Sequence, residues 1–324
     1  MSKLHVVTMG CASVLAVFAW AAVAADEARP DANAEVASVV AKEYDLGRPR
    51  SQGPQYYKQE TRVVSVAADG TRTLTCLHRL YLSYQPEGAA GRYVCRKFTV
   101  QTGTGPEVRI PALDGWSYVF VPGIDDKGQV FGIELAKFQG LVDANGAPVP
   151  PDISYHVYNA FIDFHAFCNV FAEPSAPGAG IQDLKTIGQR IVHAAAHSVG
   201  PVNLPGSSEP GSQFTNGEVT LEFKGLSVVD DAPCALVGYD SGDSSFQILM
   251  KPAPGVEVKA VGASHYRGDI YVDLASRWVR KADMIEMVVM KTTMGDKELT
   301  GGTIERTLTI KSMGEEEFDK HSAP

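Results

Sequence analysis

The sequence predicts a mainly β protein with a large antiparallel, curved sheet or half-barrel and a few short helices, which makes it α+β in detail. Three observations favour this fold class. From Tyr57 onward, apolar and polar residues alternate with a period of two in segment after segment. Gly, Pro, Asp or Asn residues separate these segments, as in turns between antiparallel strands. Neither strand-helix alternation nor a glycine-rich nucleotide loop is present, so a parallel α/β fold is not expected.

The first 24 residues have the character of a signal peptide. Lys3 precedes an apolar run, and residues 22–24 read Ala-Val-Ala, the small-x-small pattern that signal peptidase accepts. An uncleaved membrane anchor is one alternative, and a lipoprotein with Gly10 and Cys11 as its lipobox is another. We therefore expect an extracytoplasmic protein, periplasmic or secreted, with no transmembrane span after signal removal.

The chain is acidic, with 29 Lys and Arg residues, 38 Asp and Glu residues and a formal charge of -9. No basic stripe offsets this charge, so we expect no nucleic-acid partner. Hydrophobic residues make up 44% of the chain and charged residues 21%, which is ample for a large buried core in one β domain or two smaller ones.

Composition and periodicity divide the chain into consecutive parts. After a signal peptide at residues 1–24, we expect an N-terminal helix and linker at 25–55. An antiparallel β domain at 56–312 follows, with a helical insertion at about 156–200 and then a flexible tail at 313–324.

Two helices are predicted from capping residues and apolar spacing. Asp31 can cap an amphipathic helix that extends to Tyr44, and Asp183 can cap a second helix over residues 184–199.

The strands are predicted to pair mainly as hairpins. Residues 57–67 and 71–84 flank Ala-Asp-Gly, a turn signal. The next hairpin is expected to place Tyr84 opposite Arg92, and the strand series to continue through residues 128–141.

The tripeptide Arg267-Gly268-Asp269 raises the alternative of a receptor-binding loop. Ile270 and Val272 alternate with polar residues directly after it, which indicates a strand instead. We therefore predict a hairpin across residues 264–291 with Ala-Ser-Arg as its turn.

An aromatic stripe marks the helical insertion. Aromatic residues recur three or four positions apart, so one helix face should be buried. Core packing is one interpretation, and the floor or lid of an apolar ligand cavity is the other. The candidate ligand-binding residues are Tyr158, Phe161, Phe164 and Phe167.

Four cysteines follow the predicted signal peptide: Cys76, Cys95, Cys168 and Cys234. An even number in an oxidising compartment favours two disulfides. Proximity in sequence suggests Cys76 with Cys95, although the expected strand register separates them unless a bulge or a different neighbouring strand brings them together. Cys168 and Cys234 would form the remaining pair.

Candidate chemistry is sparse. His193 and His197 lie four apart on the predicted second helix and could share a divalent metal, although no glutamate completes an H-E-x-x-H motif. Two solvated histidines are the plainer interpretation. Ser241 lacks a G-x-S-x-G context. We assign no catalytic residue and no required cofactor, and leave enzymatic activity open.

The stretch GDIYVDLASRWVRKADM, Gly268–Met284, resembles the closing strand pair of periplasmic lipoprotein carriers of the LolA type. The exported chain, the N-terminal helix and the long sheet interrupted by helices are also similar to that group in layout. The resemblance implies a curved sheet around an apolar cavity, with helices as a lid.

These observations lead to three hypotheses. The first is an exported, non-enzymatic β protein that binds an apolar small molecule or lipid between the sheet and its helices. The second is a metal-binding protein or metal-dependent hydrolase that uses His193 and His197. The third is an envelope scaffold with a protein partner.

Overall fold

The computed structural model describes residues 37–39, 41–87, 90–121, 131–175, 178–202, 211–253, 255–295 and 297–323. From Val40 onward the chain forms one compact unit, distinct from Met1–Val39. The described part of the predicted N-terminal helix, residues 37–39 and 41, is helical. The predicted signal peptide lies outside the described residues.

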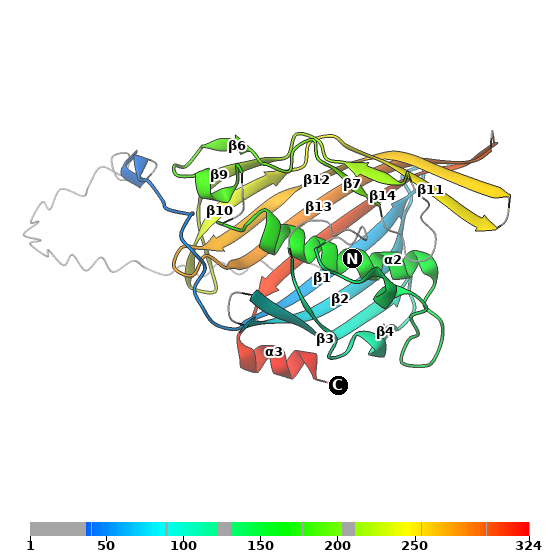
Figure 1. The fold of residues 1–324 in the computed structure, drawn as a ribbon, viewed down its shortest axis with the longest axis horizontal. Helices are drawn as coiled ribbons and strands as arrows, with labels where there is room; N and C mark the ends of the chain where they lie inside the picture. Colours follow the sequence, from blue (N-terminus) through cyan, green and yellow to red (C-terminus); the bar gives the residue numbers. More distant parts are fainter. Residues whose placement is uncertain are drawn as a thin grey trace, which may run out of the picture. The chain divides into compact units, whose positions relative to one another are not determined.

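One mainly antiparallel sheet organises the unit, which confirms the predicted fold class (Figure 1). Within the described residues, its fourteen strands follow the order β4-β3-β2-β1-β14-β13-β12-β10-β9-β6, with β5, β7, β8 and β11 beside this path. The strands are β1 (Gln55–Val66), β2 (Arg72–Glu87), β3 (Ala90–Thr102), β4 (Glu107–Arg109), β5 (Ser117–Val119), β6 (Arg190–Val192), β7 (Val199–Pro201), β8 (Gln213–Thr215), β9 (Thr220–Val229), β10 (Ala232–Asp240), β11 (Ser244–Ala253), β12 (Val256–Asp273), β13 (Val279–Met294) and β14 (Lys297–Ser312).

The hairpins confirm the predicted turns and correct one register. Asp273 ends β12, and its Oδ1 accepts hydrogen bonds from the backbone N–H groups of Ala275 and Ser276, both at 2.8 Å, so the carboxylate shapes the turn into β13. In the hairpin of β2 and β3, Tyr84 lies opposite Tyr93, one position from the expected partner. This register runs without interruption from Glu87↔Ala90 to Leu82↔Cys95, and a bulge between Tyr81 and Leu82 shifts the pairs beyond it by one further position.

Strand β12 is longer than its sequence pattern indicates. Its first half pairs with β11 and its second half with β10, while β13 pairs along its other edge. Arg267-Gly268-Asp269 lies within this strand, opposite residues 283–285 of β13. The tripeptide is therefore part of the sheet and not a loop.

The helical elements are α2 (Pro151–His165), the π-helical turn η3 (Ala166–Val170), α3 (Glu315–Ser322) and the 3-10 turns η1 (Pro111–Leu113), η2 (Leu135–Phe138) and η4 (Ile181–Asp183). α2 confirms the predicted aromatic helix. The described residues of the strand expected at 128–141 form turns and η2 instead, and Phe138 is fully buried there.

α2 and η3 cross one face of the sheet, which we call the inner face (Figure 1). Ring contacts join Phe161 to Phe98 of β3 at a centroid distance of 6.0 Å and Phe167 to Tyr239 of β10 at 5.3 Å. Burial of these rings against the sheet supplies much of the hydrophobic stabilisation of the unit.

The C-terminal tail is not a flexible segment, contrary to the sequence prediction. Residues Glu315–Ser322 form α3, and Phe318 is fully buried, 5.2 Å from the ring of Tyr56. Glu315 accepts a hydrogen bond from the Tyr56 hydroxyl at 2.7 Å, and acidic residues in the first turn suit the helix dipole. One buried aromatic anchor therefore orders an otherwise polar segment.

Candidate functional site

The four aromatic residues proposed as ligand contacts lie in the packed core. Phe161 and Phe164 are fully buried, and Tyr158 and Phe167 are 4% and 2% exposed. Phe164 contacts Tyr57 at 5.1 Å, and Tyr158 contacts Phe138 at 5.3 Å. These contacts correspond to the core-packing interpretation of the aromatic stripe.

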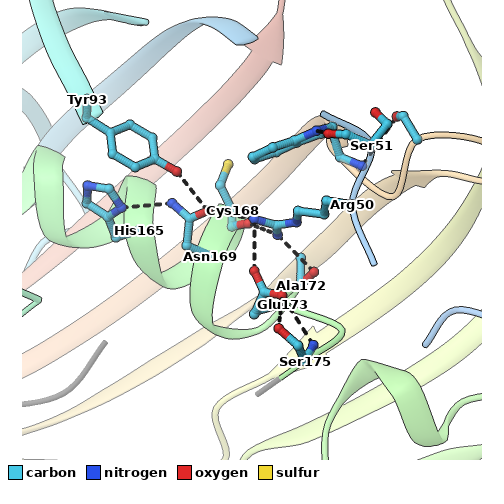
Figure 2. Close-up of polar contacts among 11 residues, drawn as sticks. Arg50, Ser51, Tyr93, His165, Cys168, Asn169, Ala172, Glu173 and Ser175 are labelled. Atoms are coloured by element: carbon cyan, nitrogen blue, oxygen red, sulfur yellow. Dashed lines mark hydrogen bonds and ion pairs between the residues drawn. The ribbon is translucent and has the colours of Figure 1, made fainter. Parts of the chain in front are cut away.

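A polar network holds His165 at the end of α2 (Figure 2). Asn169 Nδ2 donates to His165 Nδ1 at 2.8 Å, and His165 Nε2 lies 2.7 Å from the Tyr118 hydroxyl. The accepting role of Nδ1 places the ring proton on Nε2. Burial lowers the pKa of His165 well below its usual value, so the ring is neutral.

Arg50, which precedes β1, contacts the same end of the helix (Figure 2). Its guanidinium donates to Asn169 Oδ1 at 2.8 Å, to the Cys168 carbonyl and to the Ala172 carbonyl at 3.0 Å. It also pairs with Glu173 at 3.2 Å. Carbonyls at a helix C-terminus have no partner within the helix, so Arg50 caps them. We interpret this network as a structural clamp.

Three charged side chains meet beneath α2 and form what we call the charged row: Asp163, Glu286 and Arg306. Arg306 on β14 donates to Asp163 on α2 and to Glu286 on β13. Their side chains are only 10%, 9% and 7% exposed in that order. Ser264 on β12 donates to the second oxygen of Glu286. One guanidinium therefore serves two buried carboxylates.

The charged row changes the protonation of Asp163. Burial, together with the nearby Glu286 carboxylate, raises the pKa of Asp163 to about 6, although Arg306 opposes the shift. The carboxylates hold the pKa of Arg306 well above its usual value despite its burial, so the guanidinium stays charged. Asp163 is thus the member of the row that can gain a proton near neutral pH.

Neighbouring polar groups on the inner face have unsatisfied atoms. Both ring nitrogens of His78, Nδ1 of His156 and Oε1 of Gln59 have no hydrogen-bond partner within the described part of the chain. Burial lowers the pKa of His78 well below its usual value and that of His156 to about 4, so both rings are neutral at pH 7. Such atoms mark positions where buried water or a polar ligand group finds partners.

Beyond the charged row, the inner face of β11–β14 is mostly apolar, although Thr292 lies between Met290 and Met294 on it. Val288 and Met290 follow Glu286 in β13 at intervals of two with no register shift, so they point to the same face. Figure 1 shows the β11–β12 and β13–β14 hairpins extending past α2. What we call the apolar inner surface comprises Phe246, Ile248, Met250, Val258, Val288, Met290, Met294 and Ile304. Met294 is 41% exposed, and the other members are half-buried.

The structure does not contain the expected disulfides: Cys76, Cys95, Cys168 and Cys234 are buried and not bridged. Cys76 lies opposite Thr102 and Cys95 opposite Leu82, so the two are about 20 Å apart along adjacent strands. No disulfide spans that distance. Cys168 and Cys234 are likewise unbridged.

The prediction of a helix over residues 184–199 is also wrong. Its residues form β6 and turns, because Ile191 pairs with Leu221 of β9. His193 is 6% exposed and its Nδ1 accepts the backbone N–H of Ala195 at 3.0 Å, whereas His197 is exposed with φ 58°. The helical spacing that suggested a shared metal is therefore absent.

No group of three or more His, Cys, Asp or Glu side chains suited to a metal ion occurs among the described residues.

Sequence reasoning missed the charged row. Asp163 lies within the aromatic segment and carries no motif of its own, and Glu286 and Arg306 resemble ordinary polar positions of alternating strands. The available signal was parity, because both share a strand face with apolar core residues such as Met284 and Leu308.

No helix in the described ranges has the length and apolar character needed to cross a membrane.

The chain was compared with known protein families and with curated proteins. No protein-family model matches the chain, and a search of curated proteins found no match.

Proposed function

We propose that this chain is an exported, non-enzymatic protein that binds an apolar ligand, such as a lipid or acyl group, on the apolar inner surface. The observation that carries the proposal is the partial exposure of Met290, Met294 and their apolar neighbours beside a fully buried core. Contiguous apolar side chains exposed on a folded protein usually mark a binding surface.

The shape and composition of the surface favour a long, flexible ligand. From Val288 to Met294 the strand advances about 20 Å, which suits an extended chain. Met250, Met290 and Met294 contribute unbranched thioether side chains, which adapt to apolar partners of irregular shape.

The charged row supplies a boundary for such a ligand. Arg306 and Glu286 are already paired with each other, and an alkyl chain offers no hydrogen bonds to charged groups. The apolar part of the ligand should therefore end before Glu286 and leave the row and α2 in place.

Export is supported by the signal-like residues 1–24. The resemblance of Gly268–Met284 to LolA-type carriers agrees with an apolar cargo, at the level of fold.

A matched pair of methionines on β13 tests the proposal. Met290 lies on the inner face and Met287 on the opposite face, with similar surroundings in sequence. Titration with a fluorescent fatty-acid probe should show uptake by the unaltered protein. We expect Met290→Lys to weaken binding at least tenfold and Met287→Lys to change it less than twofold. No uptake, or equal losses in both variants, would contradict the proposal.

A further inference from the structure

A cleft of about 560 Å³ lies on the outer face of the sheet, away from α2. It crosses β14, β13, β12, β10, β9 and β6, and its charged lining residues are Arg190, Glu222, Lys224, Asp240, Arg267 and Asp283. Glu222 alternates with the buried Phe223, and Arg267 alternates with Tyr266, which contacts Phe167 of η3. Because neighbouring strand residues point to opposite faces, the cleft is separate from the apolar inner surface.

Gly238 keeps the floor of this cleft low. A Cβ atom on Gly238 would come within 2.3 Å of Cε of Lys224, so the glycine makes room for the lysine side chain. The lysine in turn pairs with Asp269 at 2.7 Å. The middle of the cleft is thus lined by backbone and by a neutralised ion pair.

Most charges around the cleft have partners inside the protein. Asp240 pairs with His265 at 3.1 Å, and Asp283 pairs with Lys281 at 2.6 Å. Arg190 lies directly opposite Glu222 in the register, yet its guanidinium donates to Thr220 Oγ1 at 3.1 Å.

Two charged side chains have neither a hydrogen bond nor an ion pair among the described residues: Arg267 and Glu222. The guanidinium of Arg190 is bound only to the neutral Thr220 hydroxyl. Arg267 lies on the same cross-strand row as Asp240, and Glu222 lies opposite Gly238 on the next outward-facing row. Arg267 on β12 and Glu222 on β9 are separated by two interstrand spacings, with β10 between them, and by two residues along the strand direction. Their Cα atoms are therefore about 12 Å apart. Both side chains are long enough to reach into the space between them.

We propose that this cleft binds a small dipolar ligand, an amino acid or short peptide with free termini. Arg267 receives the carboxylate, for which a guanidinium offers two parallel N–H donors. Glu222 receives the ammonium group. The opposite signs of the two unpaired groups favour a ligand that carries both charges over a simple anion or cation.

Glycylglycine is the probe, measured by isothermal titration calorimetry. We expect it to bind the unaltered protein and to lose at least tenfold in affinity in Arg267→Gln and in Glu222→Gln. Lys259→Gln and Glu257→Gln are matched controls, because both residues are exposed on β12. Each control should stay within twofold, and circular dichroism should show that all four variants are folded.

Blocked peptides assign each end of the ligand. N-acetyl-glycylglycine lacks the ammonium group, so the unaltered protein should bind it weakly and Glu222→Gln should weaken it no further. Glycylglycine amide lacks the carboxylate, so the unaltered protein should bind it weakly. Its affinity should not fall further in Arg267→Gln. Absence of glycylglycine binding at millimolar concentration overturns the proposal, as does equal binding of the acetylated peptide. Fatty-acid uptake tests the inner face independently, because none of these substitutions lies there.

Discussion

Asp163 and Arg306 are 143 positions apart in sequence, yet their side chains form a buried ion pair between α2 and the centre of the sheet. The same guanidinium also binds Glu286 on β13. Removing Arg306 therefore leaves two carboxylates without a counterion in a place from which water is largely excluded.

Arg306→Met should lower the free energy of unfolding by about 3–5 kcal/mol, because uncompensated buried charge is costly. Urea denaturation followed by circular dichroism measures this change. Arg62→Met, at an exposed position of neighbouring β1, is the control and should change stability by less than about 0.5 kcal/mol. Similar losses in both variants would mean that the charged row contributes little.

Asp163 should make stability depend on pH. Its pKa is about 6 in the folded protein and 3.8 for an ordinary aspartate, so the folded protein holds the proton more tightly. The stabilisation of the folded state by the raised pKa of Asp163 is complete below about pH 4 and is lost as the pH rises through about 6. The stability of the unaltered protein relative to Asp163→Asn should fall by about 3 kcal/mol over this range.

His156 acts in the opposite direction, because burial lowers its pKa in the folded protein to about 4, below the ordinary histidine value of 6.5. Its contribution is lost as the pH falls from about 6.5 to 4, which is why the comparison uses single variants. Urea curves at several pH values provide the measurement. Parallel pH profiles for the unaltered protein and Asp163→Asn would show that the Asp163 pKa is not raised.

The four buried cysteines should be unreactive thiols in the folded protein. Burial raises the pKa of the Cys168 thiol to about 12 and that of Cys234 to about 11, so little thiolate forms at pH 8. In protein that lacks residues 1–24, and with them Cys11, thiol titration should detect all four after denaturation without reductant and almost none before it. A reductant should leave the melting temperature unchanged. Fewer reactive thiols after denaturation, together with a lower melting temperature under reductant, would indicate disulfides.

His78→Leu should stabilise the protein by about 1 kcal/mol, because it removes two unsatisfied ring nitrogens from a site that is only 1% exposed. Leucine keeps an apolar contact with Phe98, whose ring lies 5.7 Å from the imidazole. His321→Leu on the exposed side of α3 serves as the control and should be nearly neutral. Destabilisation by more than about 1 kcal/mol would instead show that His78 binds a water molecule or ligand in solution.

Local patterns in the sequence determined the elements whose residues interact with near neighbours. The alternation in β12 and β13, the turn at Asp273 and the aromatic face of α2 each depend on a few consecutive residues. Periodicity reports such features directly, because it reflects which face of one element is buried.

The tertiary structure alone decided which distant residues meet. Pairing with β9 draws residues 190–192 into a strand despite the helical spacing of the following histidines, and burial of Phe318 orders a polar tail. A one-residue shift of register changes every cross-strand partner, so no local pattern could place Arg306 beside Glu286. The cross-strand partners, the buried ion pairs and the unbridged cysteines therefore follow from long-range strand pairing. Each depends on the burial and the register of residues from distant strands, which only the assembled sheet creates.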